Sequence, residues 1–192
     1  MYNLLINFKI IPIFTSIYAY NFKGDFMSKR IMLIEIIIVS IVGTLLHFVY
    51  DWSGQNTVIG FIGAVNESTW EHLKLLFWPL FVISTYEYFA FYKNRAGFLM
   101  SRFVATVIGM LFIAVLFYSV SGIIGKSIDF FNIALYFMAV ILTFFLSKIF
   151  LKNGFFESKG SNRTALILFL SFAVLFIIFT KRPPSLGIFQ VP

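Results

Sequence analysis

Five long stretches of the chain are almost wholly apolar, and shorter polar connections separate them. A helix of about 17 to 25 residues is long enough to cross a hydrocarbon core of about 30 Å. Because lipid offers no partner to open backbone groups, the pattern predicts membrane-spanning helices. The five predicted helices cover residues 31–50, 73–92, 98–124, 130–151 and 164–180, and the second is expected to begin about a turn earlier.

The first 26 residues are also apolar, but Lys9 and Pro12 interrupt them. This segment is either a sixth helix or a helix that lies in the membrane interface. Met27 stands directly before Ser-Lys-Arg and the first long apolar run, which is the pattern of a natural start. We therefore divide the chain into an N-terminal extension (1–26), a transmembrane helical domain (27–182) and a short external tail (183–192).

The composition agrees with a membrane protein. Of the 192 residues, 60% are hydrophobic and only 12% are charged, and the mean hydropathy is +0.92. Ordinary soluble domains carry about 25% charged residues. The sequence thus predicts an all-α integral membrane bundle with the lipid bilayer as its partner, and a homo-oligomer is compatible with it. There is no cysteine, which excludes disulfides and thiolate chemistry.

The net charge of +7 comes from lysine and arginine in the connections. Basic residues gather in cytoplasmic loops, so we expect no nucleic-acid partner. From Met27 onward, nine basic residues fall on one side of the predicted membrane: Lys29, Arg30, Lys93, Arg95, Arg102, Lys148, Lys152, Lys159 and Arg163. Four fall on the other: Lys74, Lys126, Lys181 and Arg182. This asymmetry predicts a cytoplasmic N-terminus.

A polar stripe runs along the first predicted helix. Ser40, Thr44, His47 and Asp51 follow at intervals of four, three and four residues, which places them on one helical face. Polar side chains in a membrane helix are expected to face protein or water. His47 and Asp51 lie one turn apart, and a carboxylate beside a histidine is a common way to orient a metal ligand.

His72 is the second of two histidines in the chain, and the topology brings it to the same outer leaflet as His47. We favour a hydrogen-bonded lock in which His47, Asp51, Glu67 and His72 hold the loop of residues 51–69 against the helix ends. The alternative is a site in which His47, Asp51 and His72 are ligands of zinc or another divalent metal, with Glu67 as general base. The sequence leaves both interpretations open.

Other polar residues have a structural explanation. Ser68, Thr69, Trp70 and Glu71 form the S-x-x-E pattern of a capping box before an apolar run. Lys74 follows Glu71 by three residues, so the two side chains can pair along the helix. We predict structural roles for Ser68, Glu71 and Lys74.

At the opposite side of the membrane, Glu35, Glu87 and Arg102 lie at a similar depth within their helices. Charged side chains inside a membrane are expected to pair with one another, so we predict that these three form a structural cluster. Pro79 is expected to kink the second helix and free a carbonyl near the outer polar residues, which would shape a small cavity.

The segments LHFVYDW, VNESTWEHLK and FWP lie between residues 46 and 79. With them, the chain resembles an uncharacterised family of small bacterial integral membrane proteins, known as a domain of unknown function. The resemblance implies a multi-pass protein of the bacterial cytoplasmic membrane, and it implies no activity.

Three functions are compatible with these patterns. The first is a non-catalytic accessory or binding component of the membrane. The second is a membrane-embedded, metal-dependent hydrolase with its site in the outer leaflet. The third is a small oligomeric transporter that uses the cavity beside Pro79. The sequence names no substrate and leaves open whether the protein is an enzyme.

Overall fold

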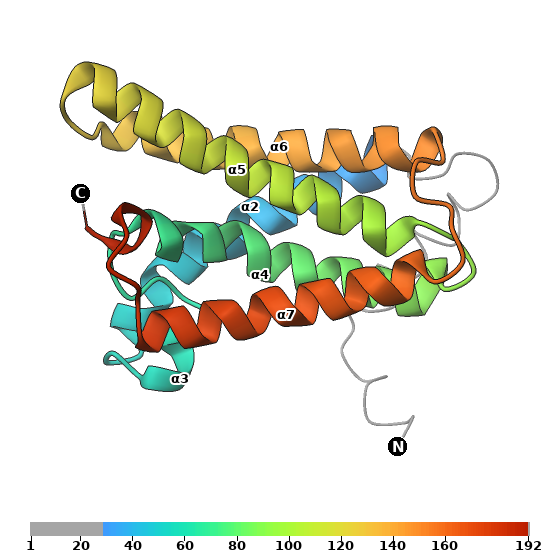
Figure 1. Cartoon of the computed structure of the whole chain (residues 1–192), viewed down its shortest axis with the longest axis horizontal. Coiled ribbons are helices and arrows are strands. Elements are labelled where there is room, and N and C mark those ends of the chain that lie inside the picture. The colour runs from blue at the N-terminus through green and yellow to red at the C-terminus, as the bar shows by residue number, and fades with distance from the viewer. Residues whose placement is uncertain (1–28, 192) are drawn as a thin grey trace.

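The computed structural model describes residues 29–191, and within this range the chain forms helices and no strand (Figure 1). Five helices are long and apolar enough to cross a membrane, which confirms the predicted all-α membrane bundle. They are α2 (Lys29–Trp52), α4 (Thr69–Glu87, continued by η1, Tyr88–Tyr92), α5 (Phe98–Ile124), α6 (Asp129–Lys152) and α7 (Ser161–Lys181). The predicted extension over 1–26 lies outside the described residues.

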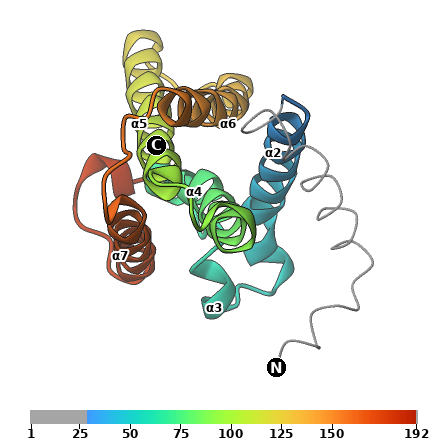
Figure 2. The ribbon, with the colours of Figure 1, turned by 90° about the vertical axis from the view of Figure 1, so that its right-hand side faces the viewer.

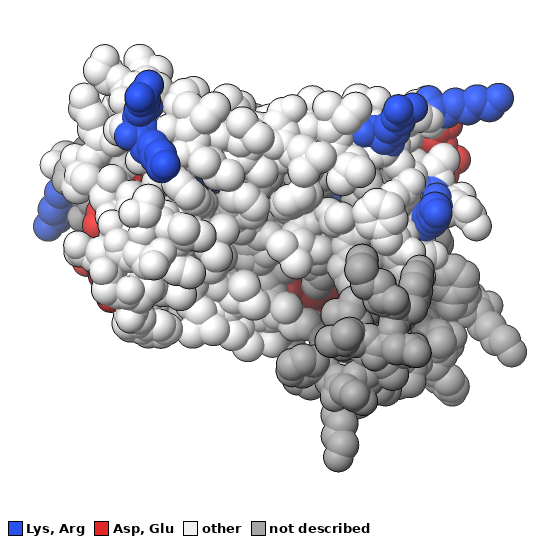
Figure 3. All heavy atoms as spheres, turned by 90° about the horizontal axis from the view of Figure 1, so that it is seen from below, with Lys and Arg blue, Asp and Glu red and all other residues white. Residues whose placement is uncertain are grey.

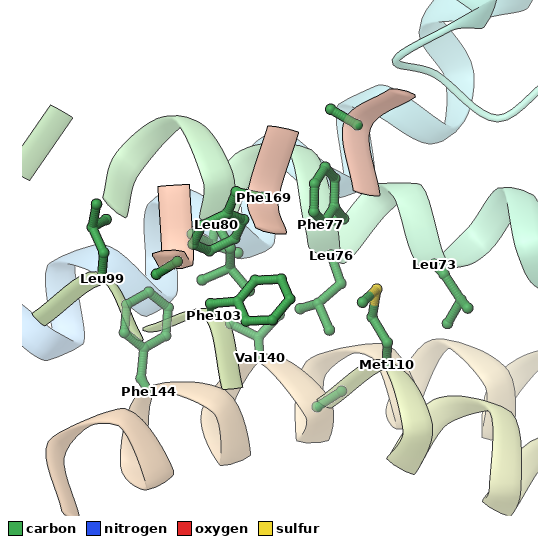
Figure 4. Packing of buried hydrophobic residues seen from close by; sticks show 14 of the residues in the cluster. Leu73, Leu76, Phe77, Leu80, Leu99, Phe103, Met110, Val140, Phe144 and Phe169 are labelled. Carbon is green, nitrogen blue, oxygen red and sulfur yellow. The ribbon is translucent and has the colours of Figure 1, made fainter. Parts of the chain in front are cut away.

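Helix α4 occupies the centre of the bundle. Seen along the bundle, α2 and α7 lie on either side of it, and α5 and α6 cover it from above (Figure 2). Its side chains Leu76, Phe77 and Leu80 are fully buried, and they face Phe103 of α5 and Phe169 of α7 in the core (Figure 4). The central helix therefore meets protein on most of its surface, whereas the other helices expose one side to lipid.

The buried stripe of α2 differs from the predicted polar one. Ile31, Glu35, Val39 and Gly43 are buried, and their spacing of four residues defines the face that packs on the bundle. Thr44 is exposed, and its hydroxyl donates to the carbonyl of Ser40 one turn back at 2.8 Å. A hydroxyl that is satisfied by its own helix needs no partner across the bundle, which is why part of the polar stripe can face outward.

Gly43 marks the closest approach of α2 to α4. A Cβ atom at this position would lie 2.5 Å from the carbonyl oxygen of Leu75. Pro79 has no N–H with which to bond that carbonyl, which is four residues back in α4. The proline thus frees a carbonyl, as predicted, and the freed oxygen faces the glycine of the neighbouring helix. Small residues commonly permit such contacts in membrane bundles.

The connection between α2 and α4 folds back at the end of the bundle and does not cross it. It contains the short helix α3 (Thr57–Gly60), and beyond it the Ala64 N–H donates to the carbonyl of Leu46 at 3.3 Å. The C-terminal tail packs at the same end through η2 (Gly187–Phe189), where Phe189 contacts Trp70 with ring centroids 4.9 Å apart. Loop and tail together cover the start of α4.

We call the end of the bundle that carries His47 and His72 the histidine end, and the opposite end, near Arg102, the arginine end. On the face shown in Figure 3, lysine and arginine side chains gather near these two ends, and the surface between them is mostly uncharged, with one small acidic patch. This distribution is typical of a protein with a lipid-facing belt.

Arg102 joins three helices near the arginine end. Its Nη2 atom lies 2.6 Å from Glu35 Oε2 of α2 and 2.8 Å from Glu87 Oε2 of α4. All three residues are fully buried, and the guanidinium also lies over the ring of Phe144 at 4.7 Å. The predicted pairing is therefore present, and it is inaccessible to solvent.

Arg102→Met removes the cation between two buried carboxylates, and we expect it to destabilise the protein by about 3–5 kcal/mol. The triple variant Glu35→Gln/Glu87→Gln/Arg102→Met removes all three charges and should recover much of that loss. Thermal unfolding in detergent micelles measures both, with Arg163→Met as the exposed arginine control. A single Arg102 variant that melts with the wild type would contradict the structural role of the cluster.

Candidate metal centre

Three potential ligands converge at the histidine end. His47 comes from the last turns of α2, His72 from the first turn of α4, and Glu67 from the loop that enters α4. The two Nε2 atoms are 3.2 Å apart, and Glu67 Oε2 lies 3.3 Å from His72 Nε2 and 3.7 Å from His47 Nε2. Within residues 29–191, one group of histidine and carboxylate side chains is arranged so that it could hold a metal ion, and it is His47, Glu67 and His72.

The orientation of His72 is fixed from its other side. Its Nδ1 atom lies 2.9 Å from the carbonyl oxygen of Ser68, which can only accept, so Nδ1 carries the proton and donates. The neutral ring then has its lone pair on Nε2, which points at His47 and Glu67. A histidine held by a backbone carbonyl through one nitrogen and presenting the other is typical of metal ligands.

The spacing of the three atoms agrees with zinc. Two ligands at 2.0–2.1 Å on a tetrahedral ion are about 3.3–3.4 Å apart. The separations of 3.2 and 3.3 Å are close to this value, and the third, 3.7 Å, is slightly longer. An ion among these atoms would have three protein ligands and one open position.

The three side chains differ in exposure. Both histidine side chains are about one-third exposed (31%), whereas that of Glu67 is 63% exposed. The imidazoles are thus held by packing, and His47 also contacts the ring of Phe48 at a centroid distance of 4.9 Å. The carboxylate, in contrast, is open to water and to an approaching ion.

A cavity of about 560 Å³ lies beside the three ligands, between α2, α4 and the α5–α6 hairpin. His47, Glu67 and His72 are part of its wall, together with Asp129 and Asn132 from the start of α6. In Figure 1 the α5–α6 hairpin extends beyond the start of α4 at this end. The candidate metal centre therefore faces an interior space large enough for a small molecule.

Asp51, predicted as a metal ligand, is not part of the group. It is exposed in the last turn of α2, four residues beyond His47. Four helical residues advance the chain by about 6 Å, so Asp51 lies one turn beyond His47 along α2. Glu67, predicted as a general base, is the third member of the group. The structure therefore brings together His47, Glu67 and His72.

A model described as "Family of unknown function (DUF6512)" matches residues 20–191. The chain belongs to this family. The match includes all three ligands of the candidate metal centre, and it begins within the segment predicted to be an extension. No curated protein and no solved structure matches the chain. The family assigns no activity.

A buried ion pair fixes the loop that carries Glu67. The carboxylate of Glu71 and the ammonium of Lys74 pair at 2.5 Å, and both residues are buried. Glu71 Oε2 also accepts from the N–H of Val65 at 3.0 Å, and Lys74 Nζ donates to the carbonyl of Gly60 at 2.8 Å. Two points of the loop are thus bonded to α4, and Glu67 follows Val65 by two residues.

The expected Glu71–Lys74 pair is present, but the capping box is only half formed. The Ser68 hydroxyl accepts from the N–H of Glu71 at 3.4 Å, whereas the N–H of Ser68 donates to Asn66 at 2.9 Å. The Glu71 carboxylate is used elsewhere, and its Oε1 atom accepts from the hydroxyl of Thr180 in α7 at 3.1 Å. The sequence carried no signal for Thr180, which is 109 residues away.

Lys74→Met leaves the Glu71 carboxylate buried without its cation and releases the loop at Gly60. We expect a loss of about 3–5 kcal/mol, which shows as a lower midpoint of thermal unfolding in detergent micelles. Lys126→Met, at an exposed lysine of the same end, is the matched control and should melt with the wild type. Adding Glu71→Gln to Lys74→Met should restore part of the midpoint. An unchanged midpoint in the single variant would show that the pair does not hold the loop.

Proposed function

We propose that this protein is a metal-dependent hydrolase of the bacterial cytoplasmic membrane, with zinc held by His47, Glu67 and His72. The observation that carries the proposal is the convergence of two Nε2 atoms and one carboxylate oxygen, at separations of 3.2–3.7 Å, on the wall of a cavity. Two histidines and a carboxylate are also the ligand set of several hydrolytic zinc sites.

The number of ligands supports a catalytic over a purely structural site. Structural zinc sites are closed by four protein ligands, whereas catalytic sites have three and keep a position for water or substrate. Zinc in such a site polarises a carbonyl or phosphoryl oxygen and makes water a nucleophile at neutral pH. The residues of this chain supply the rest: the Ser68 carbonyl orients His72, and the Glu71–Lys74 pair holds the loop that presents Glu67.

The orientation in the membrane follows from the charge asymmetry. The arginine end carries most of the basic residues, so the positive-inside tendency favours this end in the cytoplasm. The N-terminus would then be cytoplasmic, and the histidine end would open to the outer side. Trp52 is the last residue of α2, and Trp70 and Trp78 lie within the first ten residues of α4. All three are therefore toward the histidine end, where an aromatic belt is expected.

Metal content tests the proposal directly. The full chain is purified in detergent without a metal-affinity column, incubated with zinc, dialysed and measured by elemental mass spectrometry. We expect close to one zinc per chain in the wild type and loss of most of it in His47→Ala, His72→Ala and Glu67→Gln. Because none of the three side chains belongs to the buried Glu71–Lys74 pair, these variants should remain folded by circular dichroism.

Asp51→Asn is the matched control, because this carboxylate lies one helical turn beyond His47 in α2 but is not part of the group. It should retain its zinc, and loss of zinc in this variant would overturn the ligand assignment. Absence of bound zinc from the wild type after incubation would overturn the hydrolase. The same contacts would then be a hydrogen-bonded lock between two histidines and Glu67, as in a non-catalytic accessory protein.

A further inference from the structure

The cavity beside the candidate metal centre has a polar rim and an apolar interior. Near the helix ends it is lined by Glu67, Ser127, Asp129 and Asn132. Farther along the helices its wall is formed by Leu75, Ile113 and Leu135. Leu75 follows the start of α4 by six residues, and Leu135 follows the start of α6 by six, so the apolar part lies about 9 Å along these helices.

Tyr136 also lines the deeper wall, and its hydroxyl is already hydrogen-bonded within the protein. The hydroxyl of Tyr136 donates to the carbonyl of Val39 in α2 at 2.9 Å, so the residue offers its ring to the cavity. Val39 itself is fully buried. A hydrocarbon chain is the ligand that such a wall accommodates, because a polar ligand would lose its bonds to water without replacement.

The charge of the lining restricts the head group. Two carboxylates, Glu67 and Asp129, line the cavity, and no lysine or arginine of the described residues does. Phosphate head groups are usually bound by arginine or lysine, which pair with their charge. Asp129 and Asn132 offer oxygen atoms that accept from hydroxyl groups. A neutral, hydroxyl-bearing head group therefore fits the rim better than an anionic one.

The size of the cavity restricts the number of chains. A volume of about 560 Å³ lies within the range for drug-sized ligands, roughly 300–1,000 Å³. A phospholipid with two long acyl chains is larger than such a ligand, whereas a lipid with one chain is comparable. In a membrane-spanning bundle, a chain that enters the cavity from the helix ends lies parallel to the surrounding lipid.

From these features we infer that the cavity takes a neutral single-chain lipid with an ester carbonyl, such as a monoacylglycerol, whose head lies at His47, Glu67 and His72 and whose chain extends toward Ile113. The inference rests on the proposed hydrolase. Hydrolysis would add the oxygen of water to the carbonyl carbon, break the ester C–O bond, and give a fatty acid and an alcohol that takes the second proton.

The test uses the full chain in nanodiscs and a monoacylglycerol that carries a diazirine in its acyl chain. After irradiation, labelled peptides are mapped by mass spectrometry, and zinc is measured in the same samples. We expect labelling on the parts of α5 and α6 that line the cavity. Ile113→Trp fills the apolar part and should reduce this labelling by about tenfold or more without loss of zinc. Ile123→Trp, on the same helix but 86% exposed, is the matched control and should label like the wild type.

Competition identifies the head group. Unlabelled monoacylglycerol should prevent labelling, whereas lysophosphatidic acid of the same chain length should compete at least about tenfold less well. Equal or better competition by the phosphate lipid would overturn the inferred head group. Ile113 is buried, so Ile113→Trp could fail to fold. Asn132→Leu, at the half-buried rim, is therefore a second variant, and we expect it to weaken labelling as well.

The two proposals fail in different ways. Bound zinc without labelling of the cavity would overturn the lipid inference and leave the metal centre in place. Labelling of the cavity without bound zinc in any preparation would overturn the hydrolase and leave a lipid-binding protein. Labelling that Ile113→Trp and Asn132→Leu both leave unchanged would show that the lipid lies on the outer surface of the bundle, against the inference.

Discussion

A charge buried in a membrane protein is stable only beside an opposite charge, and the pair of Glu71 and Lys74 is where this constraint organises the histidine end. Two buried groups one helical turn apart satisfy each other, and their remaining bonding capacity reaches Val65 and Gly60 of the loop and Thr180 of α7. This one pair thus ties both the loop that carries Glu67 and helix α7 to α4.

The bundle is polar at both ends and apolar between them, and the two polar clusters differ in kind. Glu35, Glu87 and Arg102 are fully buried and join α2, α4 and α5. The side chains of His47 and Glu67, in contrast, are at least partly exposed to water, and both line the cavity. Both clusters involve α2, through Glu35 near its start and His47 near its end. One helix thus contributes to a closed cluster and to an accessible one.

The sequence was sufficient for the features that depend on local spacing. Apolar runs predicted all five long helices, and the interval from Glu71 to Lys74 predicted their pairing. The approach of Glu67 to the two histidines was not predictable, because its position depends on hydrogen bonds between the loop and α4. Asp51 was favoured by its spacing from His47 alone. Spacing within one helix says which residues share a face, and it leaves open which neighbouring segment completes a site.

The exposure of Glu67 bears on the order of biogenesis. Its side chain is 63% exposed, while the bonds that hold its loop are buried and involve only the protein. The polypeptide can therefore complete its insertion and folding before any ion arrives. If the proposed metal centre is correct, its maturation would be a separate, later event, so the loaded fraction of the protein would follow the zinc concentration at the histidine end.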